Sequence, residues 1–98
     1  MARFDVYRRT DRRYLLDCQA DLLTYLSTRF VVPLSPASRV PKPAARLNPV
    51  FEIDGHTLVM MTQLAAAVPV RDLGKRIASV AHRDTEIGNA LDMLLVGF

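Results

Sequence analysis

The strongest constraint on the fold is a helical pattern of apolar residues near the carboxyl end of the chain. When residues 84–98 are placed at about 100° per residue, their apolar side chains fall on one stripe, as in an amphipathic helix. The stripe consists of Ile87, Ala90, Leu91, Leu94 and Leu95. Asp84 is the expected N-cap of this helix. Because such a helix is stabilised mainly by packing of its apolar face, the preceding residues are expected to supply a surface for it.

The outward side of this helix has an unusual composition near its end. Met93 and Val96 are apolar where solvent is expected, and Asp92 is an acid in the last turns. The helix dipole disfavours an acid there by about 0.3–1 kcal/mol. The pattern leaves two interpretations open: a frayed end with scattered surface residues, or a contact surface at the tip of the helix.

Most of the chain before this helix has the pattern of short β-strands. Alternating and β-branched runs predict strands, and Asp54-Gly55 between two such runs predicts a hairpin with a type I′ turn. Pro69 indicates that the last of these runs is an edge strand. We expect strands over residues 3–7, 14–21, 29–34, 50–53, 56–61 and 68–70.

The segments between these strands are less regular. Residues 8–13 form a polar turn, and a helical turn is expected around residues 73–77. Five of the six prolines lie between Pro33 and Pro49, so residues 35–49 are expected to form one long loop. The pattern does not decide whether this loop is mobile or is a rigid cover over one end of a barrel. Pro33 cannot donate to a ladder and is expected at an edge or at a strand end.

The predicted strand over residues 14–21 is followed by an unusual apolar pair. Alternation puts one set of side chains, Leu16, Cys18 and Ala20, on one face and the acidic and amide side chains on the other. The second set is Asp17, Gln19 and Asp21. Leu22 and Leu23 follow directly, and adjacent residues of a strand cannot both point inward. At least one of these leucines is therefore expected to be exposed.

These elements predict one small domain over residues 1–98. Half of the residues are hydrophobic, with no Trp and 7% aromatic residues, so the core is expected to be aliphatic. Several short strands followed by one helix indicate a mainly β fold, a small antiparallel barrel or curled sheet with the helix packed on it. A core of this size is marginal alone, and dimerisation would stabilise it.

The charge and the isolated reactive residues favour binding over catalysis. The formal net charge is +3, and an arginine cluster lies near the amino end, without the aromatic pattern typical of nucleic-acid binding. His56 and His82 have no partner at metal-ligand spacing, and Cys18 is the single cysteine, so neither a metal site nor an intramolecular disulfide is expected. No apolar run approaches the roughly 20 residues that span a bilayer, and no signal peptide is apparent. We therefore expect a cytoplasmic protein.

The order of several short motifs along the chain resembles the CcdB family of toxins from toxin–antitoxin systems. The motifs are Phe30-Val31-Val32-Pro33-Leu34, Arg46-Leu47-Asn48-Pro49-Val50, Met60-Met61-Thr62, Ala67-Val68-Pro69-Val70, His82-Arg83 and the tail from Ile87 to Phe98. The resemblance covers essentially the whole chain. It implies a mainly β, β-rich α+β fold: an SH3-like antiparallel barrel of the CcdB/Kid type with a C-terminal helix, assembled as a homodimer.

The resemblance also implies a function without enzymatic activity and without a cofactor. CcdB-like proteins bind the A subunit of DNA gyrase and trap the gyrase–DNA cleavage complex. A CcdA-like antitoxin neutralises the toxin and, together with it, represses the operon, so operator DNA is contacted only indirectly. Such systems serve plasmid maintenance, and chromosomal copies exist.

By position, the resemblance assigns a gyrase-binding surface to seven residues: Leu22, Leu23, Asp92, Leu95, Val96, Gly97 and Phe98. The best-known member ends in Trp-Gly-Ile, and here Val96 replaces that Trp, which removes a large aromatic anchor. That member also has an asparagine where this chain has Asp92. From charge alone, we expect the turn that carries Arg8, Arg9, Arg12 and Arg13 to bind the antitoxin.

Two alternatives to a gyrase poison are considered. One is an endoribonuclease toxin of the MazF/Kid type on the same barrel, although no arginine with an acid–base partner can be selected from the sequence. The other is a non-toxic CcdB homologue that only titrates the antitoxin.

Overall fold

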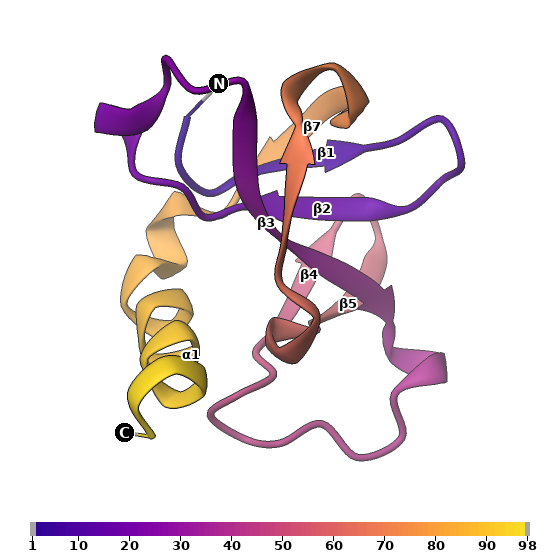
Figure 1. The fold of residues 1–98 in the computed structure, drawn as a ribbon. Helices are drawn as coiled ribbons and strands as arrows, with labels where there is room; N and C mark the ends of the chain where they lie inside the picture. The colour runs from indigo at the N-terminus through magenta and orange to yellow at the C-terminus, as the bar shows by residue number, and fades with distance from the viewer. Residues whose placement is uncertain (1, 98) are drawn as a thin grey trace.

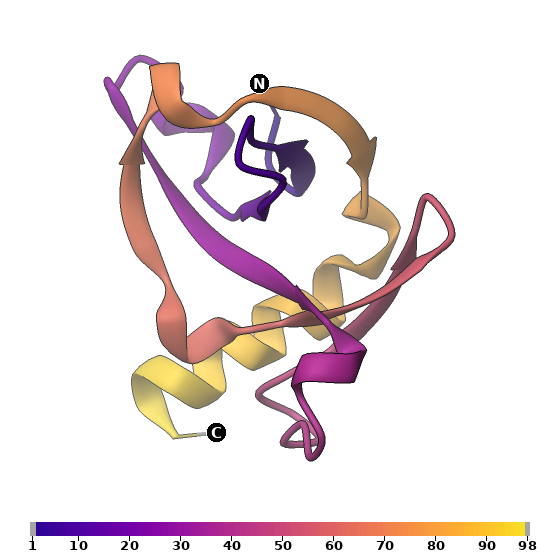
Figure 2. The same cartoon turned by 90° about the vertical axis from the view of Figure 1, so that its right-hand side faces the viewer.

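The fold is a curled antiparallel sheet with one helix packed against it (Figures 1 and 2). The computed structural model describes residues 2–97, and within them the seven strands are ordered β4-β5-β3-β2-β1-β7, with β6 also paired to β3. The strands are β1 (Asp5–Arg8), β2 (Tyr14–Asp17), β3 (Thr28–Pro36), β4 (Val50–Ile53), β5 (His56–Met60), β6 (Ala66–Pro69) and β7 (Lys75–Ser79). The helix is α1 (Asp84–Val96). The predicted mainly β, SH3-like fold with a C-terminal helix is confirmed.

Strand β3 is the central strand, and it changes partner along its length. One edge pairs with β2 over residues 31–34, while the other pairs first with β6 and then with β5. Pro33 lies inside this strand, opposite Leu15, so its expected position at an edge or strand end is wrong. The Pro33 carbonyl accepts from Met61 N (2.9 Å) between β5 and β6, so the missing N–H faces the gap where the partner changes. No ladder hydrogen bond is lost there.

The predicted β4–β5 hairpin and the predicted edge strand β6 are confirmed, with small shifts in the bounds of β5 and β6. Asp54 and Gly55 both have positive φ, 50° and 78°, as a type I′ turn between β4 and β5 requires. Strand β6 pairs with β3 and lies at the edge of the sheet, as Pro69 predicted.

The helical turn predicted around residues 73–77 is wrong, because this segment contributes to strand β7. β7 pairs antiparallel with β1, with a register irregularity after the Val6–Ala78 pair. Ile77 and Ala78 both pack against the main core. Pairing with β1 satisfies the backbone hydrogen-bonding groups of this segment, and this outweighs the helical preference of its local sequence.

The main core lies between the sheet and the first half of α1. Ile87, Ala90 and Leu91 pack there against residues of the strands, among them Phe51 and Met60. A smaller cluster on the other side of β1–β2–β3 contains Tyr7, Leu15, Val31 and Leu73. Strand β2 is therefore buried on both faces. The predicted alternation does not separate buried from solvent-exposed side chains, because Asp17 and Gln19 are also buried.

The proline-rich loop leaves β3 through a short 3₁₀ turn, η2 (Ala37–Arg39). Buried Asn48 fastens its far end, since its side chain donates to Met60 O (2.9 Å) and accepts from Ala44 N (3.0 Å). The loop thus returns the chain to β4 at a fixed point. No helix within the described residues is long and apolar enough to cross a membrane.

Candidate functional site

The last turn of α1 exposes apolar side chains that the sequence pattern placed on the core stripe. Leu94 is 39% exposed and Leu95 is 70% exposed, so their predicted burial is wrong. The carboxyl end of α1 extends past the strands of the sheet (Figures 1 and 2). With Met93 and Val96, these leucines form an apolar helix tip next to the exposed Asp92. The helix runs without interruption to Val96.

Gly97 ends the helix in a geometry that suits glycine. Its φ is 85°, and its N–H donates to the carbonyls of Asp92 (3.2 Å) and Met93 (3.1 Å). This left-handed cap fixes the direction in which the chain leaves the tip. At the other end, Asp84 is the first helical residue and not the N-cap: Arg83 occupies that position and makes no side-chain capping bond. Phe98, which was assigned to the gyrase-binding surface, lies outside the described residues.

The expected exposure of the leucine pair is confirmed, but its setting differs from the prediction. Leu22 is 87% exposed and Leu23 is 37% exposed, and both lie on a 3₁₀ turn, η1 (Asp21–Leu23), and not at a strand end. Tyr25 (79% exposed) and Leu26 extend the same apolar surface, which the sequence pattern did not predict. The sequence signal for this larger surface was a run of apolar residues interrupted by single polar residues.

A buried amide holds this leucine turn on the sheet. The Gln19 side chain donates to Leu23 O (3.0 Å) and accepts from Phe30 N (2.8 Å), and Gln19 N donates to Asp17 Oδ1 (3.1 Å). Asp21 adds a second attachment, because its carboxylate accepts from Arg3 N (2.8 Å). The exposed leucines are therefore presented by a turn that is fixed from beneath.

A buried ion pair supports the same region. Arg29 and Asp17 are both fully buried, with Nε and Nη2 of Arg29 at 2.8 and 2.7 Å from Asp17 Oδ2. Nη1 of Arg29 has no hydrogen-bond partner among the described residues. Burial, followed by the charges of Asp5 and Asp17, raises the pKa of the nearby Tyr7 hydroxyl. The pair fixes the start of β3 relative to the end of β2.

The arginine turn between β1 and β2 lies across the molecule from α1 (Figure 1). Beside it is a groove of about 660 Å³, with an apolar floor that includes Leu15, Val31 and Val68. Its lining also includes Arg9, Arg12, Arg13 and Arg39, together with Asp11. A groove of this kind can accept an extended segment that combines apolar and acidic side chains.

The structure does not bring all the predicted gyrase-binding residues together in one protomer. The leucine turn and the helix tip lie toward opposite ends of the molecule in both views (Figures 1 and 2). Residues 92–97 do form one surface, and Leu22 and Leu23 form another. A continuous surface that contains both sets requires a second protomer.

Comparison with protein-family models matched nearly the whole chain. The model described as CcdB protein matches residues 3–97. The matched range includes all seven strands, the leucine turn, the arginine turn and the helix tip through Gly97.

Proposed function

The chain belongs to the CcdB family, the toxins of CcdA/CcdB toxin–antitoxin systems, and we propose that it poisons DNA gyrase by binding the A subunit and trapping the complex of gyrase with cleaved DNA. The proposed action is binding without catalysis. The observation that supports it most directly is the helix tip, where Leu95 and Val96 are 70% and 59% exposed in a well-formed last turn.

The helix tip has the features of an interaction hot spot. Exposed apolar groups gathered in one patch mark protein interfaces more often than isolated ones do. Asp92 lies beside them and can accept charge-assisted hydrogen bonds from basic groups, each worth about 1.5–3 kcal/mol. A small apolar centre with one charged group at its side is typical of an interface that depends on few residues.

We propose that the active unit is a homodimer. A two-fold axis near the helix tips would double this patch, since a two-fold interface presents the same residues from both protomers. Dimerisation would also relieve the exposure of Leu94 and Leu64, while Leu95 stays accessible to gyrase.

We propose further that a CcdA-like antitoxin occupies the groove beside the arginine turn. The groove combines an apolar floor with four arginines, and an acidic segment with spaced apolar residues would match both properties. In the complex, operator DNA would be contacted only indirectly, through the antitoxin.

The gyrase proposal is tested by expression in cells that carry wild-type gyrase, scored for cleaved gyrase–DNA complexes. Deletion of residues 96–98, or Gly97→Arg, is expected to abolish toxicity while the dimer still folds. A His82→Ala variant, which changes an exposed residue outside the tip, serves as the control and is expected to stay toxic. Gyrase-dependent arrest by the truncated chain would refute the site. Hydrolysis of RNA by the pure protein in EDTA would refute the non-enzymatic mechanism.

The antitoxin proposal has its own test. Simultaneous replacement of Arg8, Arg9, Arg12 and Arg13 by alanine is expected to weaken binding of the cognate antitoxin at least about tenfold, through loss of charge-assisted contacts. Titration calorimetry with the purified pair measures the change. Unchanged affinity would show that the antitoxin binds elsewhere.

A further inference from the structure

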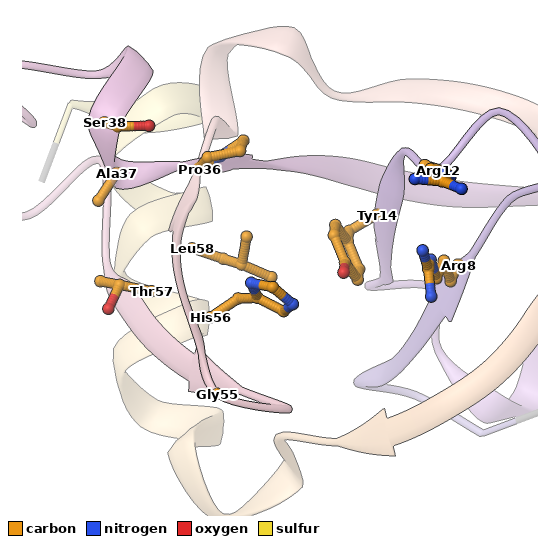
Figure 3. Close-up of a pocket in the computed structure, with 10 residues that line it drawn as sticks. All are labelled: Arg8, Arg12, Tyr14, Pro36, Ala37, Ser38, Gly55, His56, Thr57 and Leu58. Carbon is orange, nitrogen blue, oxygen red and sulfur yellow. The ribbon is translucent and has the colours of Figure 1, made fainter.

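The turn between β1 and β2 divides its four arginines into two pairs. Arg9 and Arg13 share Asp11, at 3.8 and 3.7 Å. Arg8 and Arg12 have no carboxylate within ion-pair distance among residues 2–97. These two side chains line a cleft of about 460 Å³ that adjoins the apolar groove (Figure 3). Two neighbouring cations without a counter-ion repel each other, and a bound anion would relieve that repulsion.

Arg12 occupies a backbone conformation that arginine rarely adopts. Its φ is 68°, in the left-handed region where Gly, Asn and Asp are favoured. A strained residue of this kind lowers stability and often marks a functional position. A glycine would close the same turn with less backbone strain. The guanidinium group is the feature that glycine would lack.

Two aromatic rings lie beside these arginines. The rings of Tyr14 and His56 are 6.4 Å apart between centroids, at an angle of 47°. Figure 3 shows the guanidinium groups of Arg8 and Arg12 on one side of Tyr14 and the His56 ring on the other. His56 comes from the β4–β5 hairpin, so its proximity to the arginine turn is a product of the fold. The aromatic groups that the sequence pattern lacked are therefore present in space.

We propose that this cleft binds a nucleotide unit. The phosphate would contact Arg8 and Arg12, which suit the geometry of phosphate oxygens, and the base would stack on Tyr14 or His56. Carboxylates of an acidic peptide also bind arginine, but the aromatic walls favour a planar base. The apolar floor that an amphipathic peptide needs belongs to the adjoining groove, which shares Arg12, Tyr14 and Pro36 with the cleft. The nucleotide unit can come from a free nucleotide or from a nucleic-acid strand.

Titration calorimetry of the full-length protein with AMP, adenosine, inorganic phosphate and a short single-stranded oligoadenylate tests this proposal. AMP is expected to bind more tightly than adenosine or phosphate. Arg12→Gly is expected to weaken AMP about tenfold or more through loss of a charge-assisted contact, while the melting temperature stays equal or rises. His56→Ala is expected to weaken AMP but not phosphate. Arg46→Gly, which removes the same charge from the exposed proline-rich loop, is the control.

The two sources of the ligand give different results. A strand is indicated if the oligonucleotide binds much more tightly than AMP, and a free nucleotide is indicated if it does not. The proposal is overturned if AMP does not bind at millimolar concentration, or if Arg46→Gly weakens it as much as Arg12→Gly. Displacement of AMP by oligoaspartate at equal concentration would also overturn it, because the cleft would then be a carboxylate site.

Discussion

Among single residues, Asp17 and Arg29 fix how two strands are arranged. Both are fully buried, and their ion pair joins the end of β2 to the beginning of β3. A buried pair need not stabilise a protein relative to apolar residues, but loss of one partner leaves an uncompensated charge. The pair is therefore more important for the arrangement of the strands than for net stability.

Replacement of Arg29 by methionine is expected to lower the free energy of unfolding by about 3–5 kcal/mol, because Asp17 would stay buried and charged. Urea unfolding at a fixed protomer concentration measures the loss. Arg13→Met, which removes one partner of the exposed Asp11, is the control and is expected to cost about 1 kcal/mol or less. Equal losses in the two variants would contradict this account.

The pKa of the buried Cys18 thiol leads to a prediction of how stability changes at alkaline pH. Burial, followed by the charge of Asp17, raises the pKa of this thiol from 9.0 to about 12. Between these values the unfolded chain releases a proton that the folded chain keeps, so stability falls as pH rises, by up to about 1.4 kcal/mol per pH unit. The raised pKa of Tyr7 acts in the same direction at still higher pH.

The expected result is that Cys18→Ala lowers stability by a constant amount near neutral pH and flattens its decline above pH 9.0. Urea unfolding at a series of alkaline pH values measures both effects. Parallel pH dependences for the variant and the original chain would show that the thiol does not cause the decline.

Among the elements, α1 has two parts with different roles. Its first half supplies Ile87, Ala90 and Leu91 to the core, and its last turn is exposed. The transition occurs where the helix passes the end of the sheet, since an amphipathic stripe is buried only where a partner element covers it. One continuous pattern in the sequence thus serves both folding and, in our proposal, binding.

Substitutions at two leucines of α1 test whether its first part is in the core and its last turn is a binding surface. Leu91→Ala is expected to cost about 2–5 kcal/mol of stability, whereas Leu95→Ala is expected to change it by about 0.5 kcal/mol or less. Binding to a purified gyrase A fragment should show the opposite order, with Leu95→Ala the weaker binder. Unfolding curves and binding isotherms on the same preparations provide the comparison. A stability loss at Leu95 as large as at Leu91 would place the last turn in the core.

At the scale of the whole molecule, the exposed surface argues for self-association. The leucine turn and the helix tip lie toward opposite ends of one protomer, and each exposes apolar residues. Two protomers related by a two-fold axis could cover part of this surface and pool the rest into one binding face.

If the protein is a homodimer, its apparent melting temperature should rise with protein concentration, because dissociation accompanies unfolding. Calorimetric scans over a wide concentration range measure this shift, and sedimentation equilibrium gives the mass directly. A monomer mass together with a melting temperature independent of concentration would exclude the dimer.

Local patterns in the sequence were sufficient to predict the elements whose backbone hydrogen bonds are made with residues nearby in the chain. The helix over α1 follows from apolar periodicity, and the β4–β5 hairpin follows from Asp54-Gly55, because both depend on contacts within a few residues. The order of short motifs is likewise a property of the chain alone, and it was sufficient to indicate the family.

Only the tertiary structure decided the features that depend on distant partners. Strand β7 exists because β1 pairs with it, and Pro33 fits the central strand because the neighbouring strand changes beside it. Asp17 is buried because Arg29 neutralises it, and Leu95 is exposed because the sheet ends before it. Each outcome depends on residues that are far apart in the chain, which local periodicity cannot encode.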